Sequence, residues 1–171
     1  MILALDVRYI EPPAADGVTA VVGAVLFNSW ADETPTRAES IRLTMDIAPY
    51  EPGFFYKREL PCLLAAIKHL NVGVIDTVVV DGLVFLGEGK GGLGMHLYLA
   101  TPETVRSVIG VAKTKFENAN AVEVLHGGSD RPLYVNSAGL TKDFAAQCIS
   151  DMHGPYRIPT LLKLADTLSR A

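Results

Sequence analysis

Three acidic residues stand at the edges of apolar segments, where an unpaired charge is costly. Asp6 lies near the end of the apolar run that starts the chain, Glu59 precedes a periodic apolar stretch, and Asp81 closes a β-branched run. A carboxylate beside a core needs a hydrogen bond, a counter-ion or a metal to offset its charge. Carboxylate oxygens suit Mg²⁺ or Mn²⁺, which activate water and stabilise a leaving oxygen in phosphoryl chemistry. The residue types are therefore consistent with a shared Mg²⁺ or Mn²⁺ site.

Each of these acids also fits an ordinary structural role. Glu59 stands at the start of an expected helix, where the helix dipole favours a negative charge. Asp81 is followed by Gly82, a pairing typical of turns, and Asp6 fits a surface position near a strand end. The residue types alone leave the metal site and the separate structural roles both open.

Alternating apolar residues predict that the first part of the chain forms three strands. The first strand is expected over residues 2–9, where every second residue from Ile2 to Asp6 shares one face. Further strands are expected over residues 18–28 and 40–47, joined by polar turns. Three strands joined in this way are typical of an antiparallel meander.

Helical and strand patterns alternate in the rest of the chain. Apolar spacing predicts a helix over 60–70, a strand over 74–80, a helix over 93–100, a strand over 105–112, short strands over 121–125 and 132–136, and helices over 141–152 and 159–170. This order predicts an α/β fold in which a mixed sheet, an antiparallel meander plus parallel strands, is flanked by α-helices. Without a repeat or linker, we expect one domain over residues 1–171. If the first and fourth strands are neighbours, Asp6 and Asp81 lie close together.

Composition narrows the class of protein. The chain has 171 residues and a net charge of −4, so it lacks the basic signature of many nucleic-acid binders. That charge is compatible with an enzyme whose substrate phosphates are bridged through metal ions. Cys62 and Cys148 lie in apolar stretches and are expected to be reduced core residues. No segment approaches the ~18–20 apolar residues of a membrane span, so we expect a cytoplasmic protein.

Four blocks of sequence carry a further signal. They are Asp6-Val7-Arg8-Tyr9, then Pro49-Tyr50-Glu51-Pro52-Gly53 with Lys57-Arg58-Glu59-Leu60-Pro61, then Val80-Asp81-Gly82, and last Val108-Ile109-Gly110-Val111-Ala112-Lys113. In order and spacing these blocks resemble the motifs of the endonuclease V family, metal-dependent nucleases with an RNase H-like fold. The resemblance implies hydrolysis of a phosphodiester near deaminated purine (inosine-type) sites in DNA or RNA.

The resemblance also implies roles for individual residues. The metal-binding catalytic carboxylates would be Asp6, Glu59 and Asp81, holding Mg²⁺ or Mn²⁺, and the catalytic cation near the scissile phosphate would be Lys113. The substrate-binding residues would be those of a wedge loop that helps to expose the altered base, namely Tyr50, Pro52 and Gly53. An aromatic tip on a rigid Pro-Gly bend suits a wedge between strands.

Two segments depart from the family pattern. Gly87-Glu88-Gly89 stands where the family has His-Pro-Arg, and Ala138-Gly139-Leu140 replaces a late Gly-His pair. Asp143, at the start of the next expected helix, is a candidate for a replacement ligand. Two alternatives to the nuclease therefore stay open: a relative that binds nucleic acid but has lost or changed the reaction, and a metal-dependent hydrolase of small phosphate esters.

Overall fold

A seven-stranded mixed sheet forms the centre of the molecule. The computed structural model describes residues 1–52, 54, 56–87 and 89–171. Across the sheet the strands are β3 (Arg37–Leu43), β2 (Ala20–Phe27), β1 (Ile2–Tyr9), β4 (Ile75–Asp81), β7 (Val105–Ala112), β9 (Leu133–Ala138) and β8 (Val122–Val124). β1, β4 and β7 are parallel to one another, and the outer strands on both sides pair antiparallel. The predicted α/β fold with a mixed sheet is confirmed.

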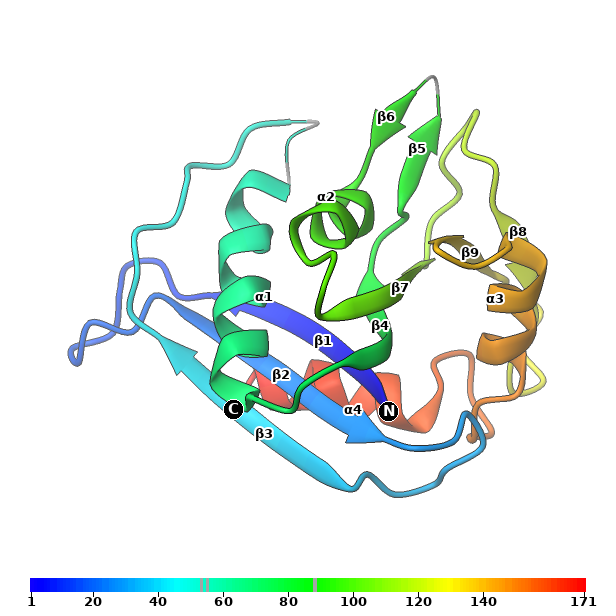
Figure 1. The fold of residues 1–171 in the computed structure, drawn as a ribbon, viewed down its shortest axis with the longest axis horizontal. Helices are drawn as coiled ribbons and strands as arrows, with labels where there is room; N and C mark the ends of the chain where they lie inside the picture. Colours follow the sequence, from blue (N-terminus) through cyan, green and yellow to red (C-terminus); the bar gives the residue numbers. More distant parts are fainter. Residues whose placement is uncertain (53, 55, 88) are drawn as a thin grey trace.

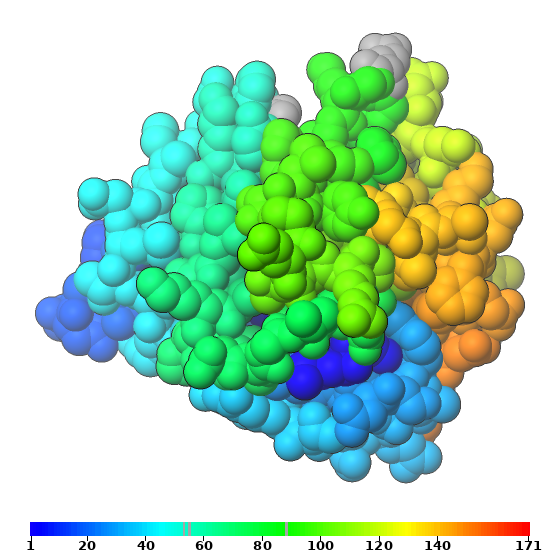
Figure 2. Space-filling view, in the orientation of Figure 1, coloured from blue at the N-terminus to red at the C-terminus, as the bar shows by residue number. Residues whose placement is uncertain are grey.

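Helices cover both faces of this sheet (Figure 1). α1 (Tyr56–Leu70) and α2 (Leu93–Ala100) pack on one face, whereas α3 (Lys142–Ser150) and α4 (Thr160–Ser169) pack on the other. Figure 2 shows the side chains of α1 and α2 covering the middle of the first face. Two separate apolar clusters result, because successive residues of each strand point to opposite faces.

The predicted strands and helices agree closely with the structure in the parallel part of the sheet. β1, α2 and β7 have the predicted bounds. The strand predicted over residues 40–47 is wrong in position, because β3 pairs with β2 from Arg37 to Leu43. A short hairpin of β5 (Phe85–Gly87) and β6 (Lys90–Gly91) also forms after β4. None of the helices in the described residues is both long and apolar enough to cross a membrane.

A glycine of β2 lets α4 lie directly on the sheet. Gly23 pairs with Asp6 in the β1–β2 ladder, and a Cβ added to Gly23 would lie 1.9 Å from the carbonyl oxygen of Ala165 in α4. The far end of α4 is held by Arg8 of β1, whose Nε donates to the carbonyl of Ser169 at 3.1 Å. The close contact at Gly23 therefore sets how near α4 comes to the end of β1.

We expect Gly23→Ala to destabilise the protein, because the new methyl group would overlap the α4 backbone. Overpacking of this kind costs about 1–3 kcal/mol, which urea unfolding at constant m-value would detect. Gly91→Ala is the matched control, since its Cβ would meet side chains rather than backbone, with the Met95 side chain nearest at 3.2 Å. Equal unfolding midpoints for the two variants would contradict the packing of α4 on Gly23.

Candidate active site

The pairing of β1 with β4 brings Asp6, in the middle of β1, near Asp81, the last residue of β4. The two strands are parallel neighbours, with Leu5 paired to Val80, so the same register sets Asp6 beside Asp81. Neighbouring strands lie about 4.7–4.9 Å apart. Because successive residues of a strand point to opposite faces, Asp6 and Asp81 lie on the same face of the sheet as Val79. Val79 belongs to the apolar cluster beneath α3 and α4. The expected neighbourhood of the first and fourth strands is confirmed.

Asp166 of α4 approaches Asp6 from that face, and the two side chains share a hydrogen bond. Burial, together with the negative charges of Asp81 and Asp166, raises the pKa of Asp6 to about 7. Partial burial opposes ionisation of Asp166, but hydrogen bonds from Lys163 and Arg170 lower its pKa overall. The raised pKa of Asp6 and the lowered pKa of Asp166 therefore favour protonation of Asp6, whose hydroxyl would donate the hydrogen bond to the carboxylate of Asp166.

Glu59 reaches the same place from the first turn of α1. Burial raises the pKa of Glu59 to about 7, and the charges of Asp81 and Asp6 add to the rise while Arg58 opposes it. The Arg58 guanidinium lies 4.1 Å from the centroid of the Tyr9 ring. This cation–π contact joins the end of β1 to α1, and so it holds Glu59 beside the strand that carries Asp6.

Lys113 brings a positive charge to the acids. Burial raises the pKa of Asp81, and the nearby Lys113 ammonium partly offsets this rise while Asp166 adds to it. Lys113 follows the end of β7, where Arg157 donates from Nη2 to the carbonyl of Lys113 at 2.5 Å and to that of Pro132 at 2.6 Å. Arg157 thus ties the backbone of Lys113 to the segment that leads into α4.

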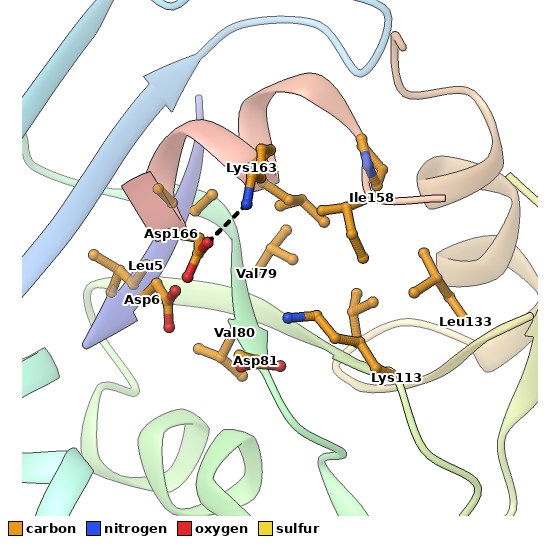
Figure 3. Close-up of a pocket in the computed structure, with 15 residues that line it drawn as sticks. Leu5, Asp6, Val79, Val80, Asp81, Lys113, Leu133, Ile158, Lys163 and Asp166 are labelled. Carbon is orange, nitrogen blue, oxygen red and sulfur yellow. Dashed lines mark hydrogen bonds and ion pairs between the residues drawn. The ribbon is translucent and has the colours of Figure 1, made fainter. Parts of the chain in front are cut away.

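Two cavities open on either side of Asp81, which lines both of them. The α4 cavity, with about 580 Å³ of open space, is lined by the carboxylates of Asp6, Asp81 and Asp166, the lysines Lys113 and Lys163, and apolar residues that include Val79, Val111, Leu133, Ile158 and Leu162 (Figure 3). The α1 cavity, with about 490 Å³, is lined by Glu59 and Asp81 with Tyr56, Gly82, Leu83, Leu86, Gly91, Gly92 and Leu93. Asp81 therefore stands between a cavity that holds Asp6 and Lys113 and a cavity that holds Glu59.

The predicted wedge residues lie in the loop before α1. Tyr50 is 59% exposed, Pro52 is also exposed, and Gly53 lies outside the described residues. The backbone turns here, because the amide of Phe54 donates to the carbonyl of Glu51 at 3.0 Å. Tyr50 and Pro52 line neither cavity, so their role as a wedge stays a prediction.

The donor set fits a hard divalent cation in its chemistry. The pKa values of Asp6, Glu59 and Asp81 are all raised, first because the fold partly removes their carboxylates from water and second because neighbouring acids repel their charges. A bound cation would favour their ionised forms, and carboxylate oxygens are the ligands that Mg²⁺ and Mn²⁺ prefer. Among the described residues, however, no three His, Cys, Asp or Glu side chains are already arranged to hold a metal ion. The carboxylates would have to change rotamer to do so.

Sequence reasoning did not assign a role to Asp166. The sequence signal was the segment Leu164-Ala165-Asp166, which stands at the apolar face of the last helix. Asp143, considered as a replacement ligand, lies exposed in the first turn of α3 and lines neither cavity. Asp166 instead contacts Asp6.

Known proteins share both the sequence pattern and the fold. The endonuclease V from Alkalilimnicola ehrlichii is 25% identical over 183 aligned positions, which cover 95% of this chain and 78% of that protein. Two crystal structures superpose over 99% of this chain. Human endonuclease V has a TM-score of 0.75 at 24% identity, with 82% of its chain covered. Ciona intestinalis endonuclease V, in complex with DNA containing an inosine, has a TM-score of 0.77 at 17% identity, with 83% covered.

These superpositions identify the fold as RNase H-like, the arrangement of the endonuclease V structures. A sequence model of one family, described as endonuclease V, matches residues 1–138. The match covers most of the chain and includes Asp6, Glu59, Asp81 and Lys113. The chain therefore belongs to the endonuclease V family.

Proposed function

We propose that this protein is a metal-dependent endonuclease that hydrolyses a phosphodiester near a deaminated purine, of the inosine type, in DNA or RNA. The observation that carries the proposal is the position of Asp81, which lines one cavity with Asp6 and Lys113 and a second cavity with Glu59. A solved relative from Ciona intestinalis is in complex with DNA that contains an inosine, which supports the choice of substrate.

The metal would be Mg²⁺ or Mn²⁺, held by Asp6, Glu59 and Asp81, with Asp166 as a further oxygen donor next to Asp6. When bound, such an ion activates a water molecule and stabilises the leaving oxygen. Lys113 binds a phosphate oxygen and so orients the phosphodiester against the acids. Its position is fixed by the hydrogen bonds from Arg157 to its backbone and to Pro132.

The α1 cavity suits the altered base. Leucine side chains and glycine backbone form most of its lining, and such walls accept a flat ring and offer it backbone hydrogen bonds. The loop of Tyr50, Pro52 and Gly53 leads directly into α1, whose residues Tyr56 and Glu59 line the same cavity. An aromatic side chain in this loop would separate the base from its neighbours, at a cost of a few kcal/mol in lost stacking.

We expect Asp81→Asn to reduce cleavage of an inosine-containing oligonucleotide by at least about 100-fold. Loss of a residue that merely supports a metal ligand costs about 10–100-fold, and loss of the charge of a ligand should cost more. End-labelled DNA and RNA, each with inosine or guanosine at one position, would be incubated with Mg²⁺ or Mn²⁺ and sized. Asp76→Asn is the control, because Asp76 lies on the same strand and pairs with the N-terminal amine.

The same assay separates the alternatives. Folded wild-type protein that cleaves neither DNA nor RNA with either metal would contradict the proposal. Binding of the inosine oligonucleotide without cleavage would identify a relative that has lost or changed the reaction. Hydrolysis of p-nitrophenyl phosphate alone would identify a small-molecule phosphoesterase.

We expect Glu59→Gln to stabilise the metal-free protein at pH 8. The pKa of Glu59 is raised from 4.5 to about 7 in the folded protein, so its contribution to stability is present below pH 4.5 and is lost as the pH rises to 7. A glutamine at this position does not ionise, so the variant keeps that stability as the pH rises. In EDTA the midpoint of thermal unfolding should rise by ~2–4 °C, the shift that ~1 kcal/mol produces in a domain of this size.

The comparison at acid pH serves as the control for this variant. At pH 4 the two proteins should unfold at similar temperatures, because Glu59 is then protonated in wild type. Added Mg²⁺ should stabilise wild type more than Glu59→Gln. A variant that is less stable than wild type at pH 8 in EDTA would show that Glu59 is not repelled by its neighbours.

A further inference from the structure

We propose that the α4 cavity, with Lys163 at its mouth, is the subsite for the nucleotide on the far side of the cleaved bond from the altered base. The inference rests on the proposed function, and it assigns a phosphate-binding role to a lysine outside the matched residues 1–138. Four observations carry it: the position of Asp81, the apolar wall, the two lysines, and the ion pairs of Asp166.

Asp81 divides the space at the site into two parts. It lines both the α1 cavity and the α4 cavity. A strand whose phosphodiester lies beside Asp81 can therefore extend towards one cavity on each side. The α1 cavity takes the altered base in the proposed function, which leaves the α4 cavity for the nucleotide across the bond.

The wall of the α4 cavity suits a nucleobase. Val79, Val111 and Leu133 form the almost fully buried floor of the cavity from three strands of the sheet, and the partly exposed apolar surface comes from Ile158 before α4 and Leu162 within α4. Apolar surfaces of this kind accept the face of any base, and they do not select among sequences. Figure 3 shows Val79, Leu133 and Ile158 around the space into which Lys113 extends.

The positive charges at the two cavities are unequal. Lys113 and Lys163 line the α4 cavity from opposite sides (Figure 3), whereas the lining of the α1 cavity contains no lysine or arginine among the described residues. In a chain of net charge −4, this is a local excess of cations. The phosphates of the substrate are therefore expected on the α4 side.

Lys163 is available for such a contact. Its Nζ lies 3.2 Å from Oδ2 of Asp166, but Arg170 already neutralises the same carboxylate through Nε at 3.1 Å. The side chain of Lys163 is 65% exposed, and exposed ion pairs contribute only ~0–1 kcal/mol. Exchanging this pair for a phosphate is therefore inexpensive, and Arg170 keeps Asp166 in place beside Asp6.

The test is the salt dependence of binding to an uncleaved inosine oligonucleotide, measured by fluorescence anisotropy with Ca²⁺ in place of Mg²⁺. Each phosphate contact contributes about 0.7–0.9 to the slope of log K against log salt. We expect Lys163→Ala to reduce the slope by that amount, and Lys163→Arg to retain it. Lys68→Ala, an exposed lysine on α1, should leave the slope unchanged.

Shortened oligonucleotides locate the contact. The oligonucleotide would be trimmed one nucleotide at a time from each end towards the inosine. Wild type and Lys163→Ala should differ in the slope of log K against log salt. We expect this slope difference to vanish when the nucleotides on one side of the inosine are removed, and to persist when those on the other side are removed. Thermal unfolding of each variant would verify that it folds.

The outcomes separate this inference from the proposed function. Tight binding by wild type with the same slope for Lys163→Ala would overturn the role of Lys163 and leave the nuclease proposal intact. A slope difference that survives trimming from both sides would overturn the subsite. Folded wild type that neither binds nor cleaves any of these oligonucleotides would overturn the proposed function, and the subsite with it.

Discussion

Partial desolvation of a group of carboxylates, together with their mutual repulsion, is the constraint on which the structure of this site depends. The pairing of β1 with β4 fixes Asp6 beside Asp81, and α1 brings Glu59 to the same point. Each of these acids has a raised pKa, so ionising them in the folded protein costs free energy. Such a cost is characteristic of functional sites, where strained electrostatics serve binding or catalysis.

The rest of the molecule holds these charges in place. α4 lies on Gly23 of β2, directly opposite Asp6, and this close approach gives Asp6 a proton acceptor in Asp166. Across the site, Arg157 secures the backbone that carries Lys113. The contacts that stabilise α4 on the sheet are thus the same contacts that position the acids. The last helix therefore contributes to the site as much as the motifs of the first strands do.

Local patterns in the sequence predicted much of this arrangement. The alternation that ends at Asp6 and the apolar run before Asp81 predicted two strand ends, and parallel pairing brought them together. The position of β3 could not be predicted in the same way, because its pairing with β2 decides which residues join the sheet. Asp166 was missed for a similar reason. Its place beside Asp6 follows from the contact of α4 with Gly23, a tertiary contact that the segment Leu164-Ala165-Asp166 does not reveal by itself.

The central claim, that these carboxylates form a metal site, is tested most directly by calorimetric titration of Mn²⁺ into the protein at pH 7. Metal binding must displace protons from carboxyl groups that are still protonated, and Asp6 and Glu59 both have pKa values of about 7. Titrations in buffers of different ionisation enthalpy should reveal about one proton released for each Mn²⁺ bound. Absence of binding at millimolar Mn²⁺, or binding without proton release, would contradict the account.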